Sequence, residues 1–153
     1  MQDPTPKKPR RDSGVNMDTS GLAAWDHKPG DPKRPDWRDL ETGADVRLDD
    51  VNQPSAYLRL PGEQRAALQG WIGQELVPAP LAGPRCSYAL KHVFHRLPGG
   101  FYLTNGEFKG AMLAAGYEPV DRTELNWKFR FVFADPDLPA RSIAADIERW
   151  RVA

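Results

Sequence analysis

Apolar residues recur at helical spacing in four stretches of the chain, and the stretch from Thr104 to Gly116 is the most sharply bounded. Thr104-Asn105-Gly106-Glu107 fits a capping box, in which the hydroxyl and the carboxylate each accept a hydrogen bond from the other residue's backbone N–H. Four apolar residues follow at i, i+3, i+4 and i+7: Phe108, Ala111, Met112 and Ala115. Gly116 suits the left-handed residue that ends a helix, so the pattern predicts a capped helix with one buried face.

The other three stretches predict helices of similar length. One covers about 61–76, with an apolar stripe of Leu68, Trp71, Ile72 and Leu76. The next covers about 87–97, with a stripe of Leu90, Val93, Phe94 and Leu97. The last follows Asp137 as N-cap, and its stripe is Ile143, Ile147 and Trp150. Each stripe is expected to face the core.

Strict alternation over Trp127–Phe133 predicts a strand. It places four aromatic residues on one face (Trp127, Phe129, Phe131 and Phe133) and Lys128 and Arg130 on the other. We expect this strand to form a β-hairpin with Tyr117–Val120, and Phe101–Leu103 to form a further short strand. The aromatic face is expected to pack in the core, although such a ladder could also serve as a base-stacking platform.

The first 55 residues differ in composition from the rest. Residues 1–50 hold nine Lys and Arg, eleven Asp and Glu, many prolines and few aliphatic residues, which predicts a disordered or extended tail. Its basic start, Lys7 to Arg11, is either a solvated tail or an arm that contacts phosphate. Trp25 and Trp37 lie in this stretch and are expected to dock on the domain or on a partner. The domains expected are therefore a tail (1–55), a domain (56–135) and a C-terminal helix (136–153).

The amino-acid composition limits the classes of function to be considered. The chain has 21 Lys and Arg against 21 Asp and Glu, which does not favour a nucleic-acid coat or a membrane-surface protein. A single cysteine and the lack of a long apolar run favour a cytoplasmic protein without a membrane span. Cys86, His92 and His95 are better explained as surface residues than as metal ligands, because a fourth ligand is missing. With no catalytic or phosphate-loop motif, the sequence predicts neither an enzyme nor a cofactor.

The order of elements resembles that of a winged helix-turn-helix. The resemblance is carried by FYLTNGEFKGAMLAAGYEPV followed by NWKFRFVF, and it covers roughly 57–133. The same residues are similar to small, largely uncharacterised phage and mobile-element proteins of high-GC bacteria that share the pattern SYxLKH…YxTNGxFKxAMxxAGYxP…NWxF. The expected fold is α+β and winged-helix-like: three helices, a short strand and a β-hairpin, followed by a C-terminal helix.

The resemblance implies non-catalytic DNA binding, because many winged helices bind DNA. The helix after Thr104 would enter the groove with Asn105 and Lys109, while Arg122, Lys128 and Arg130 would contact the backbone. Alternatively, Asn105 supports the turn and Lys109 is solvated surface. Residues 56–135 carry a formal charge of only +2, which is small for a tight duplex binder.

The second hypothesis is a protein-binding adaptor or inhibitor that acts on a host or phage complex. It would use the same helix face, where Gly110 and Leu113 leave room for close approach, together with Trp25 and Trp37.

Overall fold

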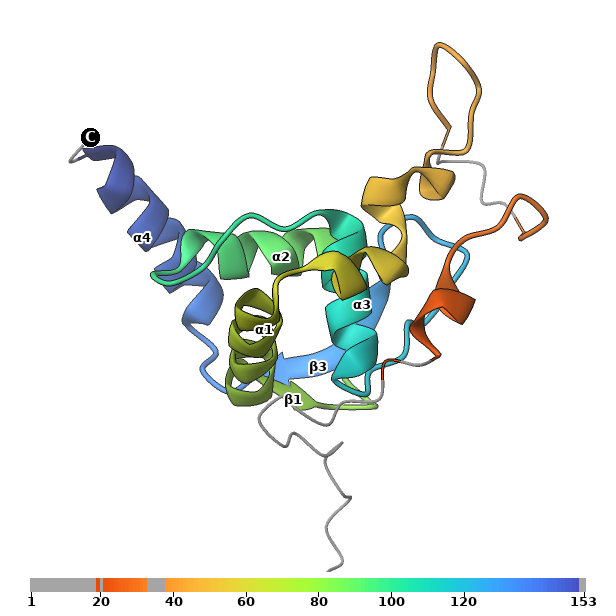
Figure 1. The fold of residues 1–153 in the computed structure, drawn as a ribbon. Helices are drawn as coiled ribbons and strands as arrows, with labels where there is room; N and C mark the ends of the chain where they lie inside the picture. Colours follow the sequence, from red (N-terminus) through yellow and green to blue (C-terminus); the bar gives the residue numbers. More distant parts are fainter. Residues whose placement is uncertain (1–18, 20, 33–37, 152–153) are drawn as a thin grey trace, which may run out of the picture.

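The computed structural model describes residues 19, 21–32 and 38–151, and over these the fold is α+β (Figure 1). Its α-helices are α1 (Gly62–Glu75), α2 (Ser87–Arg96), α3 (Asn105–Ala114) and α4 (Leu138–Arg151). Its strands are β1 (Leu76–Pro78), β2 (Pro84–Cys86) and β3 (Lys128–Phe133). Four short 3₁₀ helices precede α1: η1 (Leu22–Trp25), η2 (Val46–Leu48), η3 (Asp50–Asn52) and η4 (Pro54–Arg59). The four α-helices lie where the apolar spacing predicts them.

The local signals of α3 are confirmed in detail. Thr104 Oγ1 accepts from the Glu107 N–H at 3.2 Å, and Glu107 Oε1 accepts from the Thr104 N–H at 2.8 Å. Gly116, with φ of 92°, follows the helix. The predicted stripe is fully buried: Phe108, Ala111, Met112 and Ala115 are each 0% exposed.

The sheet differs from the predicted hairpin. β3 lies between β1 and β2 and is antiparallel to both, with Leu76 opposite Phe133 and Cys86 opposite Lys128. Residues 79–83 carry the chain from one edge of β3 to the other. β1 and β2 take the pairing positions along 131–133 and 128–130 of β3, and 117–120 does not become a strand, although the Val120 N–H bonds the Lys128 carbonyl at 2.8 Å. The predicted hairpin is therefore wrong. The strand predicted at 101–103 is also wrong, because these residues have no regular secondary structure. The winged-helix arrangement is not confirmed.

The aromatic face of β3 forms the centre of the core, as predicted. Trp127, Phe129 and Phe131 are 0% exposed. Trp127 and Phe129 meet edge to face with ring centroids 6.3 Å apart, a geometry worth about 0.5–1.5 kcal/mol beyond burial of area. Trp127 and Phe129 are closed off from ligands, whereas Phe131 and the partly buried Phe133 line one side of a small apolar pocket, so the four rings do not form an open base-stacking platform.

Two described parts of the predicted tail, 22–27 and 45–55, pack against the domain, whereas 38–44 form an exposed loop. Leu22 belongs to the core, and Trp25 meets Trp127 edge to face at 6.0 Å. Two hydrogen bonds from Ser55, at 2.8 and 2.6 Å, hold the Asp26 carboxylate. Position 55 is thus no boundary between tail and domain. The basic stretch Lys7 to Arg11 and Trp37 lie outside the described residues.

Helix α4 leaves the body beside α2 and projects past it (Figure 1). Leu138 and Ser142 are buried, and Arg149 donates to the Arg96 carbonyl of α2 at 2.8 Å. The apolar stripe faces the other way: Ile143, Ile147 and Trp150 are 51%, 56% and 75% exposed. The expectation that this stripe covers the core is therefore wrong.

Candidate functional site

The α3 face that was expected to enter a groove is packed inside the protein. Lys109 is 0% exposed and Asn105 is 8% exposed. A Cβ atom added at Gly110 would collide with Pro54 and Tyr57 of η4, and one added at Gly106 would collide with Gln53. The small residues of α3 therefore admit the chain's own upstream segment, which leaves this face unavailable to DNA or to a protein partner.

Lys109 instead belongs to a buried polar cluster. Its Nζ lies 2.9 Å from Nε2 of His27 and donates to the Asn52 carbonyl at 3.1 Å. The same ammonium stands 4.9 Å from the ring centroid of Trp127. These contacts join the upstream segment, α3 and the residue preceding β3.

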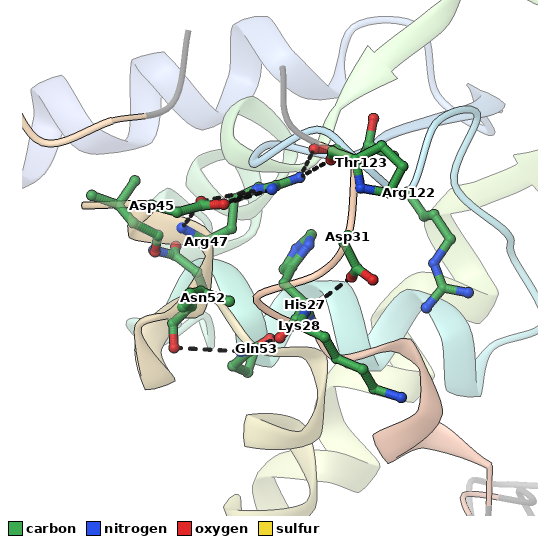
Figure 2. Close-up of polar contacts among 12 residues, drawn as sticks. His27, Lys28, Asp31, Asp45, Arg47, Asn52, Gln53, Arg122 and Thr123 are labelled. Carbon is green, nitrogen blue, oxygen red and sulfur yellow. Dashed lines mark hydrogen bonds and ion pairs between the residues drawn. The ribbon is translucent and has the colours of Figure 1, made fainter. Parts of the chain in front are cut away.

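Arg47 is the second cation of this cluster and is 1% exposed. Its guanidinium lies between the Asp45 carboxylate and the Thr123 carbonyl, with His27 nearby (Figure 2). It also donates to the Pro32 carbonyl at 2.9 Å. A paired and hydrogen-bonded cation of this kind fixes the segments around it, because any other arrangement would leave a charge buried without a partner.

Burial shifts both titratable groups at the centre of the cluster. Burial, followed by the charge of Arg47, lowers the pKa of Lys109 to about 7. Burial, followed by the charge of Lys109, lowers the pKa of His27 to about 3. Such values can mark catalytic groups, but a side chain with no exposed surface meets no substrate. We therefore interpret Lys109 and His27 as structural residues that hold the fold together.

The three cations predicted to contact a DNA backbone are exposed or partly exposed, and each already has a partner. Arg122 donates to the Ala24 carbonyl at 3.0 Å and stacks on the ring of Trp25. Lys128 pairs with Glu124 at 3.5 Å, and Arg130 donates to the Ala82 carbonyl at 2.7 Å. Each of the three side chains therefore already makes a contact within the protein.

Two of the predicted partner-binding residues meet at one hollow. Trp25 and Leu113 line a pocket of about 220 Å³ between η1 and the end of α3. Its other lining residues are Gly21, Leu22, Gly116, Tyr117 and Glu118, so only Glu118 supplies a charged side chain. Gly110, the third predicted residue, is not in this pocket.

A second hollow, which we call the tyrosine pocket, has richer chemistry. It has a volume of about 240 Å³ and lies where α2, the start of α3 and residues 125–126 meet. Its lining residues are Val51, Asn52, Tyr88, Lys91, Tyr102, Thr104, Asn105, Leu125 and Asn126. The sequence analysis missed it, except for Asn105.

Two exposed tyrosines stand over one buried lysine at this pocket. Tyr88 is 50% exposed and Tyr102 is 65% exposed, whereas Lys91 is 6% exposed. The Lys91 ammonium lies 5.0 Å from the Tyr88 ring centroid and 5.1 Å from that of Tyr102. It donates to the Leu103 carbonyl at 3.0 Å. Burial lowers the pKa of Lys91, and the nearby Glu107 carboxylate opposes that shift.

Amide groups line the same pocket. Asn105 accepts from the Ser87 hydroxyl at 3.1 Å and donates to Asn126 Oδ1 at 3.1 Å. Asn105 is thereby held in place, whereas no hydrogen bond joins Asn126 Nδ2 to any acceptor in the described part of the chain. The pocket thus combines two aromatic rings, a buried cation and an amide donor.

The size of the tyrosine pocket limits what it can hold. Its volume of about 240 Å³ lies below the roughly 300 Å³ at which sites for whole drug-sized ligands start. One flat group of a larger ligand fits this space better than a complete cofactor does. Within the described ranges, no group of three or more His, Cys, Asp or Glu is placed to bind a metal ion. No helix among the described residues is long and apolar enough to cross a bilayer.

Comparison with protein-family models, with curated proteins and with solved structures found no match to this chain. The resemblance to winged-helix proteins of phages and mobile elements therefore stays a prediction.

Proposed function

We propose that this protein is a non-catalytic nucleic-acid-binding protein that holds unpaired bases of a single strand at the tyrosine pocket. The observation that carries the proposal is the pair of half-exposed rings, Tyr88 and Tyr102, on either side of Lys91. Exposed aromatic rings beside cations are the usual means by which proteins bind single strands without reading a duplex. Burial of the α3 face argues against duplex binding through a recognition helix.

The chemistry of the pocket suits a nucleobase. A base has two flat faces that can stack on tyrosine, and its edge carries acceptors that an amide donor such as Asn126 can meet. The rings of His92 and His95 meet those of Tyr88 and Tyr102 in T-shaped contacts, with ring centroids 4.6 and 6.0 Å apart, and so support the two tyrosines from α2. Since the chain has no net charge, we expect stacking to supply most of the affinity and phosphate contacts to supply little.

Fluorescence anisotropy with labelled single-stranded oligothymidylate, oligouridylate and a mixed-sequence duplex tests this proposal. We expect the single strands to bind more tightly than the duplex and with a shallow salt dependence. Replacing Tyr88 or Tyr102 by Ala should weaken single-strand binding by roughly 5- to 150-fold, the equivalent of about 1–3 kcal/mol of stacking per base.

Tyr88→Phe and Tyr102→Phe are the matched controls, because they keep the ring and remove only the hydroxyl, and they should bind nearly as well as the parent protein. Absence of single-strand binding at micromolar protein would refute the proposal. Binding that both alanine variants retain would also refute it. If the pocket captures a peptide side chain instead, Tyr88→Ala will abolish binding to a protein partner in nuclease-treated extract while single strands do not bind.

A further inference from the structure

The outer face of α4 carries an apolar stripe with nothing over it. Ile143, Ile147 and Trp150 are all more than half exposed, and they follow one another at spacings of four and three residues. At about 100° per residue, this stripe lies roughly 140° around the helix axis from the face that packs on α2. Side chains of this size seldom stand together in water unless another surface covers them.

We propose that the stripe is covered by a second copy of this chain, with the two α4 helices packed antiparallel about a two-fold axis. The spacing is that of alternating a and d positions in a helix pair, and the preceding a position is Ala140. In an antiparallel pair each a position meets a d position, so Ile143 packs on the partner's Ile147. The same register places Trp150 over the partner's Ala140, and a two-fold axis repeats both contacts.

The surface beside Ala140 is suited to receive a tryptophan. Pro139 lines an apolar pocket of about 140 Å³ together with Val93, Phe131 and Phe133. The ring of Trp150, which is 75% exposed in one chain, would lie against the mouth of this pocket in the other. An aromatic anchor entering an apolar pocket is the kind of contact that dominates the affinity of protein interfaces.

Charge at the two ends of α4 agrees with this register. Arg151, which pairs with Glu148 of its own chain at 3.8 Å, ends α4, and Asp137 immediately precedes the helix at its other end, so an antiparallel pair brings Arg151 near the partner's Asp137. Asp146 is paired with Arg149 of its own chain at 3.2 Å. A parallel pair would separate Arg151 from Asp137 by the length of the helix.

The interface expected is small. One tryptophan buries about 150–250 Å², and the stripe adds two isoleucines, which together fall short of the roughly 800 Å² per partner of a standard interface. We therefore infer a reversible dimer that forms at micromolar concentrations. This inference does not depend on the proposed nucleic-acid binding.

Sedimentation velocity over two orders of magnitude of protein concentration tests for the dimer. The mean mass should rise from that of one chain toward that of two, and Ile147→Asp should keep the protein monomeric throughout. Leu81→Asp is the matched control: Leu81 is 99% exposed but lies in the loop between β1 and β2, so this variant should dimerise like the parent. A parent protein that stays monomeric, or a dimer that survives Ile147→Asp, would overturn the proposal.

Disulfide trapping tests the register. In a Cys86→Ser background, a chain with Ile143→Cys is mixed with a mass-tagged chain with Ile147→Cys. The antiparallel register predicts that disulfides joining an Ile143→Cys chain to an Ile147→Cys chain outnumber disulfides between two chains of the same kind. Predominance of like-with-like disulfides would show a parallel pair and reject the register, as would a failure to cross-link.

Discussion

At the scale of single residues, the chain buries charge where its local sequence gives no sign of it. Lysine and arginine are almost never fully buried unless they are paired, so a lysine on an amphipathic helix is normally assigned to solvent. Lys109 is an exception because its partners lie far away in the sequence, and Arg47 is one because distant carbonyls complete the pair that it forms with the neighbouring Asp45. Lys109 meets His27 and Asn52, and Arg47 meets Thr123.

This burial predicts how stability depends on pH. Since folding lowers the pKa of Lys109 to about 7, the unfolded chain carries a proton above pH 7 that the folded chain has lost. Stability should therefore rise between about pH 7 and pH 9, with Lys109 contributing at most about 1.4 kcal/mol per pH unit. Below neutral pH, His27 acts in the same direction, because its pKa of about 3 makes folding less favourable as the pH falls from about 6.5 toward about 3.

Urea unfolding of the parent and of Lys109→Met, measured from pH 7 to pH 9, checks the contribution of Lys109. The methionine leaves Asn52 and His27 without their partner, so the variant should be less stable at every pH by roughly 1–3 kcal/mol. The informative quantity is the slope of the free energy of unfolding against pH, which should fall by up to about 1.4 kcal/mol per pH unit in the variant. An unchanged slope in Lys109→Met would mean that another group is responsible.

At the scale of elements, helices were easier to predict from the sequence than strand pairing. The capping box, the apolar spacing and Gly116 locate α3 through local contacts alone. The pairing of β3 depends on residues about 50 positions upstream in a proline-rich stretch, whereas strands that follow one another pair in most proteins, which favoured the hairpin. Prolines at 78 and 84 are tolerated because β1 and β2 are the outer strands.

The same limit explains why the exposure of α3 was misjudged. Glycines on a helix let another backbone approach closely, but the sequence does not say whether that backbone belongs to a ligand or to the chain itself. Here Asn52 and Gln53 pack across Gly106, and η4 packs across Gly110. The tyrosine pocket was missed for a related reason, since Tyr88, Tyr102 and Asn126 come from three separate segments.

The packing of α3 on η4 gives a matched pair of glycine substitutions. Gly110→Ala should destabilise the protein by roughly 1–3 kcal/mol, because the new Cβ collides with the Pro54 backbone and with Tyr57. Gly70→Ala should stabilise it by roughly 0.5–1 kcal/mol, because Gly70 lies inside α1 with open space around it. Thermal or urea unfolding measures both, and equal effects of the two substitutions would contradict the packing.

At the scale of the whole molecule, the segment that looks least like a folded domain completes the core. Its composition predicts a tail because apolar residues are few, and that rule fails here because two of those few, Leu22 and Trp25, contact the core. Polar groups join 26–27 to 53–55: Gln53 accepts from the His27 N–H at 2.7 Å and Asp26 accepts from the Ser55 N–H at 2.8 Å. Amino-acid composition alone does not reveal specific contacts of this kind.

Hydrogen exchange can decide whether this segment unfolds with the domain or separately. If the described part of residues 1–55 is integral to the fold, the amides of His27 and Ser55 should open only with global unfolding, within about 1 kcal/mol of the amides of β3. The Asp31 amide, which bonds the Lys28 carbonyl within a local turn, should exchange much faster. Fast exchange at His27 and Ser55 beside slow exchange in β3 would mean that the segment detaches. Detachment would uncover Lys109, Gly106 and Gly110 together, and the face of α3 would then be open to a partner after all.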